Sequence, residues 1–330
     1  MKVIVTGATG FMGRNLVEGL KQDGMEVIAT GRNREVGAEL EKSGVDFRPA
    51  DIEDQKGLIK ALSPTDCLVH SAGKSGHGDE YNEYHGPNVV GTRNVVEACR
   101  RHGIRKIIFI SSPSIYFTRK DRYDISEDEP LPKKQKNPYS LTKLISEREL
   151  LALAPEGFRT IILRPRGVYG PHDNTIVPII LKLAEKDAIP LINGGNALVD
   201  VTYVENYVDA VKKGLRAKDS AWNHAYNISN GDPITMREWF AEVLKIFDVP
   251  FRPKSIPIPA AKVMAGLMEA ASFLPFGPKK PAMTRFTVGY MARSMTLSLK
   301  KAKDMLGYAP RIGTQEGFER YARWYRERGG

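Results

Sequence analysis

The sequence has little cysteine and no cluster of metal-binding side chains. Only Cys67 and Cys99 occur among 330 residues, each in an apolar or helical context. This excludes a disulfide framework, and we expect two buried, reduced thiols. No Cys and His residues have the spacing of metal ligands, so we expect no metal site.

Long apolar runs are also missing, and we expect no leader segment. The chain begins Met1-Lys2 and enters an apolar strand pattern at once, so we expect no targeting segment and a cytoplasmic location. Residues 260–276 carry an apolar helical stripe, but Pro275 and two charges make this stretch too short and too polar to span a bilayer. The stripe comprises Val263, Met264, Leu267, Met268, Ala271 and Leu274. We expect it to pack on the protein's own core; the alternative is a long-chain pocket or a peripheral membrane contact.

Acidic residues are outnumbered by basic ones. The chain has 49 Lys and Arg against 39 Asp and Glu, a net charge of +10. The segment from Lys279 to the end is especially basic. Anionic partners to consider are cofactor phosphates, an acyl carrier and a membrane surface. No nucleic-acid module is recognisable, so we expect no nucleic-acid partner, and a solvated basic face is the simplest interpretation.

Short apolar strands alternate with helical patterns in the first half. Strands are expected at residues 3–5, 27–30, 67–70, 106–110 and 161–163, and helices at 15–22, 89–102 and 141–153. This order predicts an α/β fold of the Rossmann type, a doubly wound parallel sheet, with a smaller mixed C-terminal substrate domain. We assign residues 1–170 to the dinucleotide-binding domain, with 199–230 returning to it through strands at 201–204 and 225–228. Residues 171–198 and 231–330 would form the substrate domain.

A glycine motif lies between the first expected strand and the first helix. It reads Thr6-Gly7-Ala8-Thr9-Gly10-Phe11-Met12-Gly13. Gly7 permits a tight turn, Gly10 lets backbone approach a pyrophosphate, and Gly13 lets helix and strand pack closely. The helix N-terminus then favours the negative charge. The motif predicts dinucleotide binding by residues 7–13, including Thr9, Phe11 and Met12.

Acidic residues are absent where an NAD-binding acid would be expected. No Asp or Glu occurs from Val27 through Arg34. Arg32 can instead pair with a 2′-phosphate, and Gly31 removes bulk beside it. We therefore favour NADP over NAD as the cofactor. Alternatively, Arg32 is solvated or stacks on adenine, and either cofactor binds.

Further cofactor contacts are expected at two strand ends. Asp51 and Ile52 follow the third strand, where the aspartate can take the adenine amino group, although a plain loop aspartate is nearly as good an interpretation. The fourth strand ends in a segment of mostly small residues that suits backbone beside a cofactor. This segment is His70, Ser71, Ala72 and Gly73. His70 taken alone is better explained as a satisfied core histidine than as a catalyst.

Tyr139 and Lys143 lie four residues apart, which places them on one face of a helix. A phenol has a pKa of about 10, and a nearby cation lowers that pKa toward the working range. Such a pair can move a proton to or from a carbonyl or alcohol oxygen. Ser111 and Ser112 end the fifth strand at the edge where open α/β sheets bind ligands, so a serine there can complete the set.

With these motifs the chain resembles the extended short-chain dehydrogenase/reductase family over nearly its whole length. Gly7, Gly10, Gly13, Asp51, His70, Ala72, Asn88, Ser112, Tyr139 and Lys143 fall in the family's order. The resemblance implies that Tyr139 is the general acid or base. It implies that Lys143 lowers the tyrosine pKa and holds the nicotinamide ribose, and that Ser112 polarises the substrate oxygen. The stretch 163–171 resembles the loop bordering the nicotinamide, which implies cofactor contacts at Pro165, Arg166 and Val168, with Ser111 nearby.

The resemblance is closer to one branch of the family. Members acting on sugar nucleotides typically carry an arginine where this chain has Val199, and an apolar side chain cannot replace a phosphate contact. The stretches 111–117, 198–206 and 284–289 look like the 3β-hydroxysteroid dehydrogenase and 2-alkyl-3-oxoalkanoate reductase branch. This implies NAD(P)-dependent interconversion of a ketone and a secondary alcohol on an apolar substrate, a 3-oxo or 3-hydroxy acid or a steroid-like compound. We expect substrate contacts at Lys74, Ser114, Arg166 and Val199.

Two other functions remain open at this point. One is a sugar-nucleotide epimerase or dehydratase with unusual phosphate contacts. The other is a non-catalytic NAD(P) sensor, although such a protein would be expected to lose the Tyr139–Lys143 pair. The helices at 89–102 and 141–153 resemble those that pair subunits in the family, which implies a homodimer.

Overall fold

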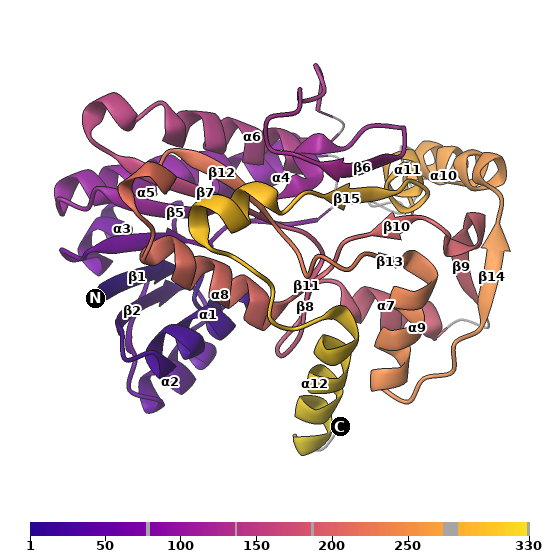
Figure 1. Cartoon of the computed structure of the whole chain (residues 1–330), viewed down its shortest axis with the longest axis horizontal. Helices are drawn as coiled ribbons and strands as arrows, with labels where there is room; N and C mark the ends of the chain where they lie inside the picture. The colour runs from indigo at the N-terminus through magenta and orange to yellow at the C-terminus, as the bar shows by residue number, and fades with distance from the viewer. Residues whose placement is uncertain (77–79, 136, 186–187, 273–282, 329–330) are drawn as a thin grey trace.

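Seven parallel strands form the central sheet of the molecule (Figure 1). The computed structural model describes residues 1–76, 80–135, 137–185, 188–272 and 283–328. In sheet order the strands are β12 (His224–Ile228), β7 (Arg159–Pro165), β5 (Lys106–Ile110), β4 (Cys67–His70), β1 (Lys2–Thr6), β2 (Glu26–Gly31) and β3 (Asp46–Pro49). The order changes direction between β1 and β4. Ligands of open α/β sheets bind outside the carboxyl ends of the strands at such a point.

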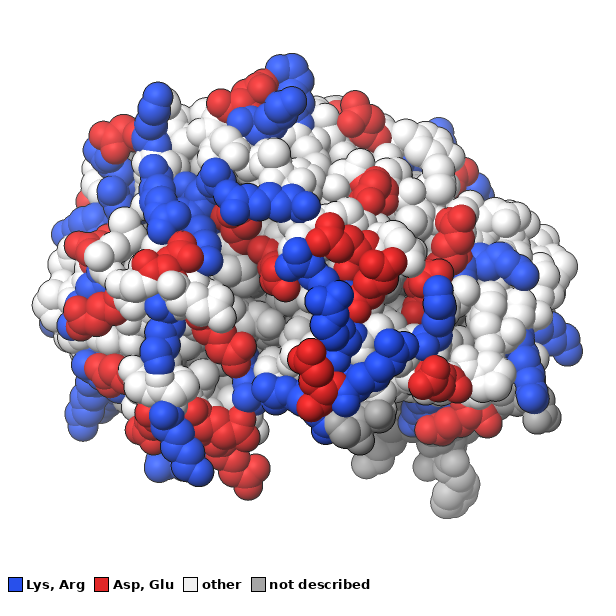
Figure 2. Space-filling model, turned by 60° about the horizontal axis from the view of Figure 1, so that its bottom comes forward, with Lys and Arg blue, Asp and Glu red and all other residues white. Residues whose placement is uncertain are grey.

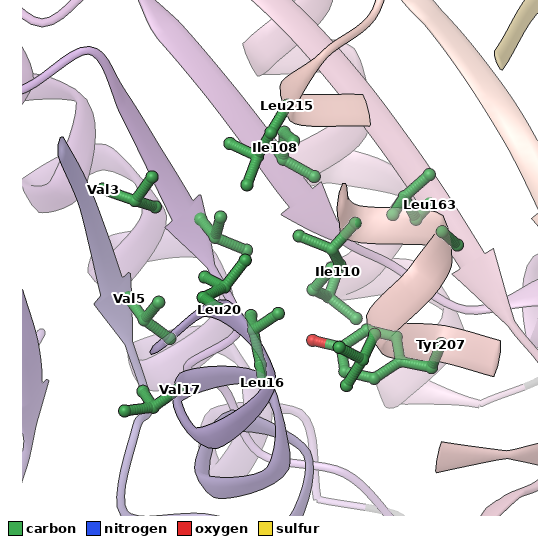
Figure 3. Packing of buried hydrophobic residues seen from close by; sticks show 14 of the residues in the cluster. Val3, Val5, Leu16, Val17, Leu20, Ile108, Ile110, Leu163, Tyr207 and Leu215 are labelled. Carbon is green, nitrogen blue, oxygen red and sulfur yellow. The ribbon is translucent and has the colours of Figure 1, made fainter. Parts of the chain in front are cut away.

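Helices cover both faces of this sheet. One face carries α1 (Phe11–Gln22), α2 (Arg34–Lys42) and α8 (Val204–Leu215); the other carries α3 (Gln55–Ala61), α5 (Gly91–Arg101) and α6 (Pro138–Leu151). Along β5, Ile108 and Ile110 point into the first layer, which packs against α1, α2 and α8. Ile107 and Phe109 point into the second layer, which packs against α3, α5 and α6. Figure 3 shows the first layer from close by, where strand residues meet Leu16 of α1 and Tyr207 of α8. The strand sequences are continuously apolar because both faces are buried, and the predicted doubly wound α/β fold is confirmed.

A smaller mixed region adjoins the carboxyl ends of the strands. A four-stranded sheet has the order β13 (Ile234–Thr235), β10 (Leu198–Val199), β15 (Met295–Leu297) and β6 (Arg122–Ile125). Two strand pairs accompany it, β11 (Thr202–Tyr203) with β8 (Val168–Tyr169) and β14 (Pro253–Ile256) with β9 (Ile189–Ile192). Its helices are α7 (Val177–Ala184), α9 (Met236–Ile246), α10 (Ile258–Ser272), α11 (Arg285–Met291) and α12 (Thr314–Glu327). The region has core clusters of its own, one of them built around Trp239 and Phe240.

Strand pairing differs from the predicted division of the chain in two places. β6 lies within residues 1–170 but pairs with β15 of the smaller sheet. The expected strand at 201–204 does not return to the main sheet, because β11 pairs with β8 instead. Only β12 joins the main sheet, beside β7. Strands of two to four residues leave no readable alternation, and their partners lie far away in the chain, so local pattern could not assign them.

The apolar stripe of residues 260–276 is oriented differently from our expectation. Ala261 and Ala265 are buried against α11, whereas Val263 and Leu267 are 64% and 67% exposed. The expectation that the stripe is core was wrong because α10 approaches its neighbour through its small residues. Leu274, Pro275 and Phe276 fall outside the described residues. In the part of the chain that the structure describes, no helix has the length and apolar character needed to cross a bilayer.

Charged residues at the surface are mixed. Figure 2 shows Lys and Arg side chains interspersed with Asp and Glu on the face it presents. Several C-terminal basic residues are paired: Arg320 lies 2.9 Å from Glu205 and 2.7 Å from Glu316, and Lys300 lies 2.5 Å from Asp304. Both cysteines are buried thiols. Within the described ranges, no group of three or more side chains is placed to hold a metal ion.

Candidate active site

A cleft of about 930 Å³ opens where the sheet order changes direction. Ten residues that the sequence indicated line it: Gly7, Thr9, Gly10, Arg32, Asp51, Ile52, Ser71, Ala72, Gly73 and Lys74. Nine further residues complete the lining: Thr30, Gly31, Asn33, Ala50, Glu53, Ser75, Asn82, Glu83 and Pro87. Lys74 was expected at the substrate, but it lies in this cleft, where its ammonium is 2.7 Å from Glu83.

The glycine motif shapes one wall of the cleft by close approach of backbone. A Cβ on Gly7, whose φ is +72°, would lie 2.7 Å from the Cα of Ala72. A Cβ on Gly13 would lie 2.1 Å from the carbonyl oxygen of Gly7. α1 begins after Gly10 with no side-chain cap and no acid in its first turn, so its leading N–H groups remain available to an anion. The turn and the helix end therefore fit a pyrophosphate.

Arg32 lies at the open rim of the cleft. Its side chain is 73% exposed, and one terminal nitrogen is 3.6 Å from a carboxylate oxygen of Asp51. Gly31 beside it has a packing role that the sequence did not reveal, because a Cβ there would lie 2.4 Å from the hydroxyl of Thr9. Arg32 could therefore bind a phosphate at the rim, in competition with the carboxylate of Asp51.

Ser112 and Tyr139 come together at the end of β5. Ser112 caps the short helix η2 (Pro113–Tyr116) by accepting a hydrogen bond from the N–H of Ser114 at 3.2 Å, and its hydroxyl is the polar neighbour that acts to lower the pKa of the Tyr139 phenol. The hydroxyl of Ser111 is buried without a partner in the described chain, so Ser112 is the serine that meets the phenol. Lys143 donates to the carbonyl of Ile110 at 2.8 Å.

Lys143 also links this set to the cleft. Its ammonium would lie 3.5 Å from a Cβ on Gly73, which lines the cleft. Asn88, in the π-helical turn η1 (Gly86–Val90), fixes the same corner. Its amide accepts from the N–H of Lys74 at 2.7 Å and donates to the hydroxyl of Thr142 on α6 at 3.0 Å. Asn88 therefore fixes the cleft segment at Lys74 relative to α6, the helix that carries Tyr139.

The buried position of the catalytic set changes its proton affinities. Burial raises the pKa of Tyr139 to about 12, and the hydrogen bond from Ser112 opposes this rise. Burial lowers the pKa of Lys143 to about 8, opposed by the charge of Glu147. We expected Lys143 to lower the pKa of the phenol, but it is not among the groups that act on Tyr139. The ammonium instead lies against the Ile110 carbonyl and 4.7 Å from the centre of the Phe109 ring.

Several predicted site residues lie away from the cleft. The ring nitrogens of His70 are 2.8 Å from the Thr6 hydroxyl and 3.0 Å from the Thr92 hydroxyl. Burial, aided by the charge of Lys143, lowers the pKa of His70 to about 3, so it is a neutral core residue. Val168 and Val199 are buried in core clusters, because each belongs to a short strand that packs inward. Phe11, Met12, Gly13 and Pro165 are also outside the lining of the cleft.

Aromatic residues from distant segments surround Arg166 next to the catalytic set. Arg166 donates to the hydroxyl of Tyr290 at 3.0 Å. The Tyr290 ring lies 5.6 Å from that of Phe117, which lies 5.2 Å from that of Phe286. Tyr290 also acts electrostatically on the Tyr139 phenol. The sequence analysis missed Tyr290 because it is about 150 positions from Tyr139; only the stretch 284–289 beside it gave a signal.

Comparison with known proteins places the chain in a family. A model of the NAD dependent epimerase/dehydratase family matches residues 3–229. The chain is 32% identical to the 2-alkyl-3-oxoalkanoate reductase of Stenotrophomonas maltophilia (strain K279a), over 97% of this chain and 98% of the relative. It is 33% identical to the 3beta-hydroxysteroid-dehydrogenase/decarboxylase isoform 1 of Arabidopsis thaliana, over 96% of this chain and 78% of the relative.

The fold is shared with solved structures at lower identity. UDP-glucuronic acid 4-epimerase from Bacillus cereus, in complex with NAD, superimposes with a TM-score of 0.74 at 21% identity, with all of both chains covered. The predicted family is confirmed, and the reductase and dehydrogenase names of the relatives agree with the predicted class of enzyme. The chain belongs to the NAD dependent epimerase/dehydratase family.

Proposed function

We propose that this protein is an NAD(P)-dependent oxidoreductase that interconverts a ketone and a secondary alcohol on an apolar substrate. The observation that carries the proposal is the placement of Ser112 next to Tyr139 at the end of β5, with Lys143 reaching a cleft suited to a dinucleotide. The cofactor, when bound, supplies or accepts the hydride. Gly7, Gly10 and the first turn of α1 would hold its pyrophosphate.

Tyr139 is the residue that moves the proton. With a pKa raised to about 12, the phenol is protonated at neutral pH and donates a hydrogen bond to a carbonyl oxygen. As negative charge develops on that oxygen, Tyr139 transfers its proton and Ser112 keeps the oxygen in place. In the reverse direction Tyr139 would first have to lose its proton, and the phenolate would then accept the proton of the alcohol.

The substrate class is supported by the aromatic wall and by the relatives. Phe117 and Phe286 form an aromatic cluster with Tyr290, which in turn acts on the Tyr139 phenol. The named relatives act on an oxoalkanoate and on a 3-hydroxysteroid. Sugar-nucleotide chemistry is the alternative that the structural neighbours favour. Against it stands Val199, an apolar core residue where sugar-nucleotide enzymes typically carry an arginine.

A cofactor-oxidation screen tests this function. Purified protein is offered NADPH and NADH with 2-alkyl-3-oxo acids, 3-ketosteroids and short ketones. We expect turnover of the longer apolar ketones and a fall of about 10²- to 10⁴-fold in kcat for Tyr139→Phe. Undiminished turnover in Tyr139→Phe would sink the catalytic assignment. Tight calorimetric binding of UDP-glucose, with no ketone turned over, would support the sugar-nucleotide alternative, and cofactor binding without any turnover would support the sensor alternative.

Two finer features belong to the same proposal. NADP is the favoured cofactor because Arg32 stands at the rim of the cleft with no acid between Val27 and Arg34. A cytoplasmic homodimer joined through α5 and α6 is the favoured assembly. Light scattering on the eluting peak of a sizing column tests the dimer, and a mass near 37 kDa, that of one chain, would contradict it.

A further inference from the structure

Arg166 is a buried cation that lacks an ionic partner. Its residue is 3% exposed, yet no carboxylate of the described residues lies within 4.0 Å of its guanidinium. One terminal N–H donates to Tyr290 at 3.0 Å, while the Nε–H has no hydrogen-bond partner among those residues. A buried unpaired charge is costly, and an anionic ligand at this position would offset that cost.

The nearby acid is already engaged elsewhere. Asp200 feels the charge of Arg166, but its two carboxylate oxygens accept hydrogen bonds from the N–H of Leu297 at 2.6 Å and the hydroxyl of Ser229 at 3.1 Å. Arg166 can therefore present its Nε edge to another anion. The planar guanidinium fork matches a carboxylate with two parallel hydrogen bonds.

Arg166 and Tyr139 share Tyr290 as a neighbour, so the Nε–H of Arg166 is near the proposed reaction site. Tyr290 connects the two sites, since it accepts from Arg166 and acts on the Tyr139 phenol. Phe117 and Phe286 continue the aromatic wall from Tyr290. A ligand that fits has an anionic group a few bonds from its reacting carbon and an apolar body.

We propose that Arg166 is a specificity-determining residue, which binds a carboxylate of the substrate close to the carbon that Tyr139 and the cofactor act on. This inference rests on the proposed function and assigns the side chain that would select an acid over a neutral ketone or alcohol of the same apolar body. The competing explanation is that Arg166 only balances the charge of buried Asp200.

A pair of probes, one with a negative charge and one neutral, tests the inference. 3-Hydroxyoctanoate and its methyl ester are compared as substrates for oxidation with NADP⁺, and as ligands in calorimetry. We expect the wild type to prefer the acid. In Arg166→Gln the acid-to-ester ratio of kcat/KM should fall about 10- to 100-fold, because one charge-assisted contact is lost. Arg166→Lys should restore part of the ratio. Arg285→Gln, which removes an exposed charge from the same α11 that carries Tyr290, should leave the ratio unchanged.

Three outcomes would overturn the inference. One is a wild type that prefers the ester, which needs no variant to fold. The second is an Arg166→Gln enzyme in which both probes weaken equally, as a purely structural role predicts. The third is calorimetric binding of the acid that Arg166→Gln does not change. If the acid binds in an Arg166-dependent way but neither probe is oxidised, the proposed function fails for hydroxy acids while the anion subsite stands.

Discussion

The two sides of the site present their arginines in opposite surroundings. Arg32 stands at an open rim, 73% exposed and 3.6 Å from the carboxylate of Asp51. Arg166 stands in a closed aromatic region, 3% exposed and without a carboxylate within 4.0 Å in the described chain. Water screens the charge of Arg32, so we expect this side chain to change the preference between NADP and NAD only modestly. The charge of Arg166 is desolvated. An anionic ligand would therefore gain more binding free energy from it, whereas a neutral ligand would leave the guanidinium without a counter-charge.

Arg164 gives a reference for what a satisfied buried arginine looks like. It lies two residues before Arg166, at the end of β7, and its guanidinium meets both carboxylate oxygens of Glu147 at 3.0 and 2.5 Å. It also donates to the hydroxyl of Tyr116. This pair joins β7 to α6, the helix of Tyr139 and Lys143. Arg164 is thus structural, and its neighbour Arg166 is left for a ligand.

The largest effect on stability should come from breaking the Arg164–Glu147 pair. Glu147→Gln leaves a buried guanidinium without its counter-charge, and we expect a loss of about 3–5 kcal/mol in the free energy of unfolding. Urea denaturation followed by circular dichroism measures this loss. A loss below about 1 kcal/mol would mean that water reaches the pair, which would also weaken the description of this side as closed.

A pH effect on stability should come from His70, which is buried at the end of β4, next to the residues that line the cleft. Its pKa is about 3 in the folded chain and about 6.5 when unfolded. Between these values the unfolded chain binds a proton that the folded chain does not, so stability falls as the pH drops through 6.5. At pH 5 the contribution is a loss of about 2 kcal/mol. His70→Asn should show a weaker dependence on pH in denaturation series between pH 7 and 5. An identical dependence in both proteins would contradict a buried neutral His70.

Much of the open side could be predicted from sequence, because its residues follow one another locally. Gly7, Thr9, Gly10, Arg32 and Asp51 lie in turns after successive strands, and parallel strands bring such turns to one edge. The closed side depends on contacts between segments more than a hundred residues apart, such as Arg166 with Tyr290. No local period carries that information. Val199, which we expected as a substrate contact, lies in a core cluster, and its strand neighbours, Ile234 and Met295, likewise come from distant segments.

The pKa of Tyr139 was misjudged for a related reason. The four-residue spacing to Lys143 places both on one helix, but the side-chain directions depend on packing. The carbonyl of Ile110 attracts the ammonium, and burial then dominates the phenol. Spacing drew attention to Tyr139 and Lys143, whereas their proton affinities depend on their surroundings in the fold.

A moderate effect should come from the exposed arginine of the cofactor rim. In Arg32→Ser we expect the NADPH-to-NADH ratio of kcat/KM to fall about tenfold, equivalent to about 1.4 kcal/mol. The effect should shrink in high salt because the site is exposed. Arg34→Ser is the matched control, since Arg34 is exposed nearby but does not line the cleft. An unchanged ratio in Arg32→Ser would leave NADP preference without its proposed cause.

The smallest effect should come from the ion pair between Arg93 of α5 and Glu149 of α6. Its two hydrogen bonds, 2.9 and 2.6 Å, resemble those of Arg164 and Glu147, but its side chains are 56% and 37% exposed in the single chain. Glu149→Gln should cost less than about 1 kcal/mol, measured by the same urea denaturation as Glu147→Gln two residues away on one helix.

The size of this smallest effect also bears on the assembly. If α5 and α6 join two subunits, the Arg93–Glu149 pair becomes desolvated, and removing one partner should then cost several kcal/mol. The cost would also grow with protein concentration, because the dimer is stabilised by mass action. A small cost that does not depend on concentration would place the pair in water and argue against pairing through these helices. Comparing the stability losses of Glu147→Gln and Glu149→Gln therefore distinguishes an ion pair buried within one chain from an ion pair buried between two subunits.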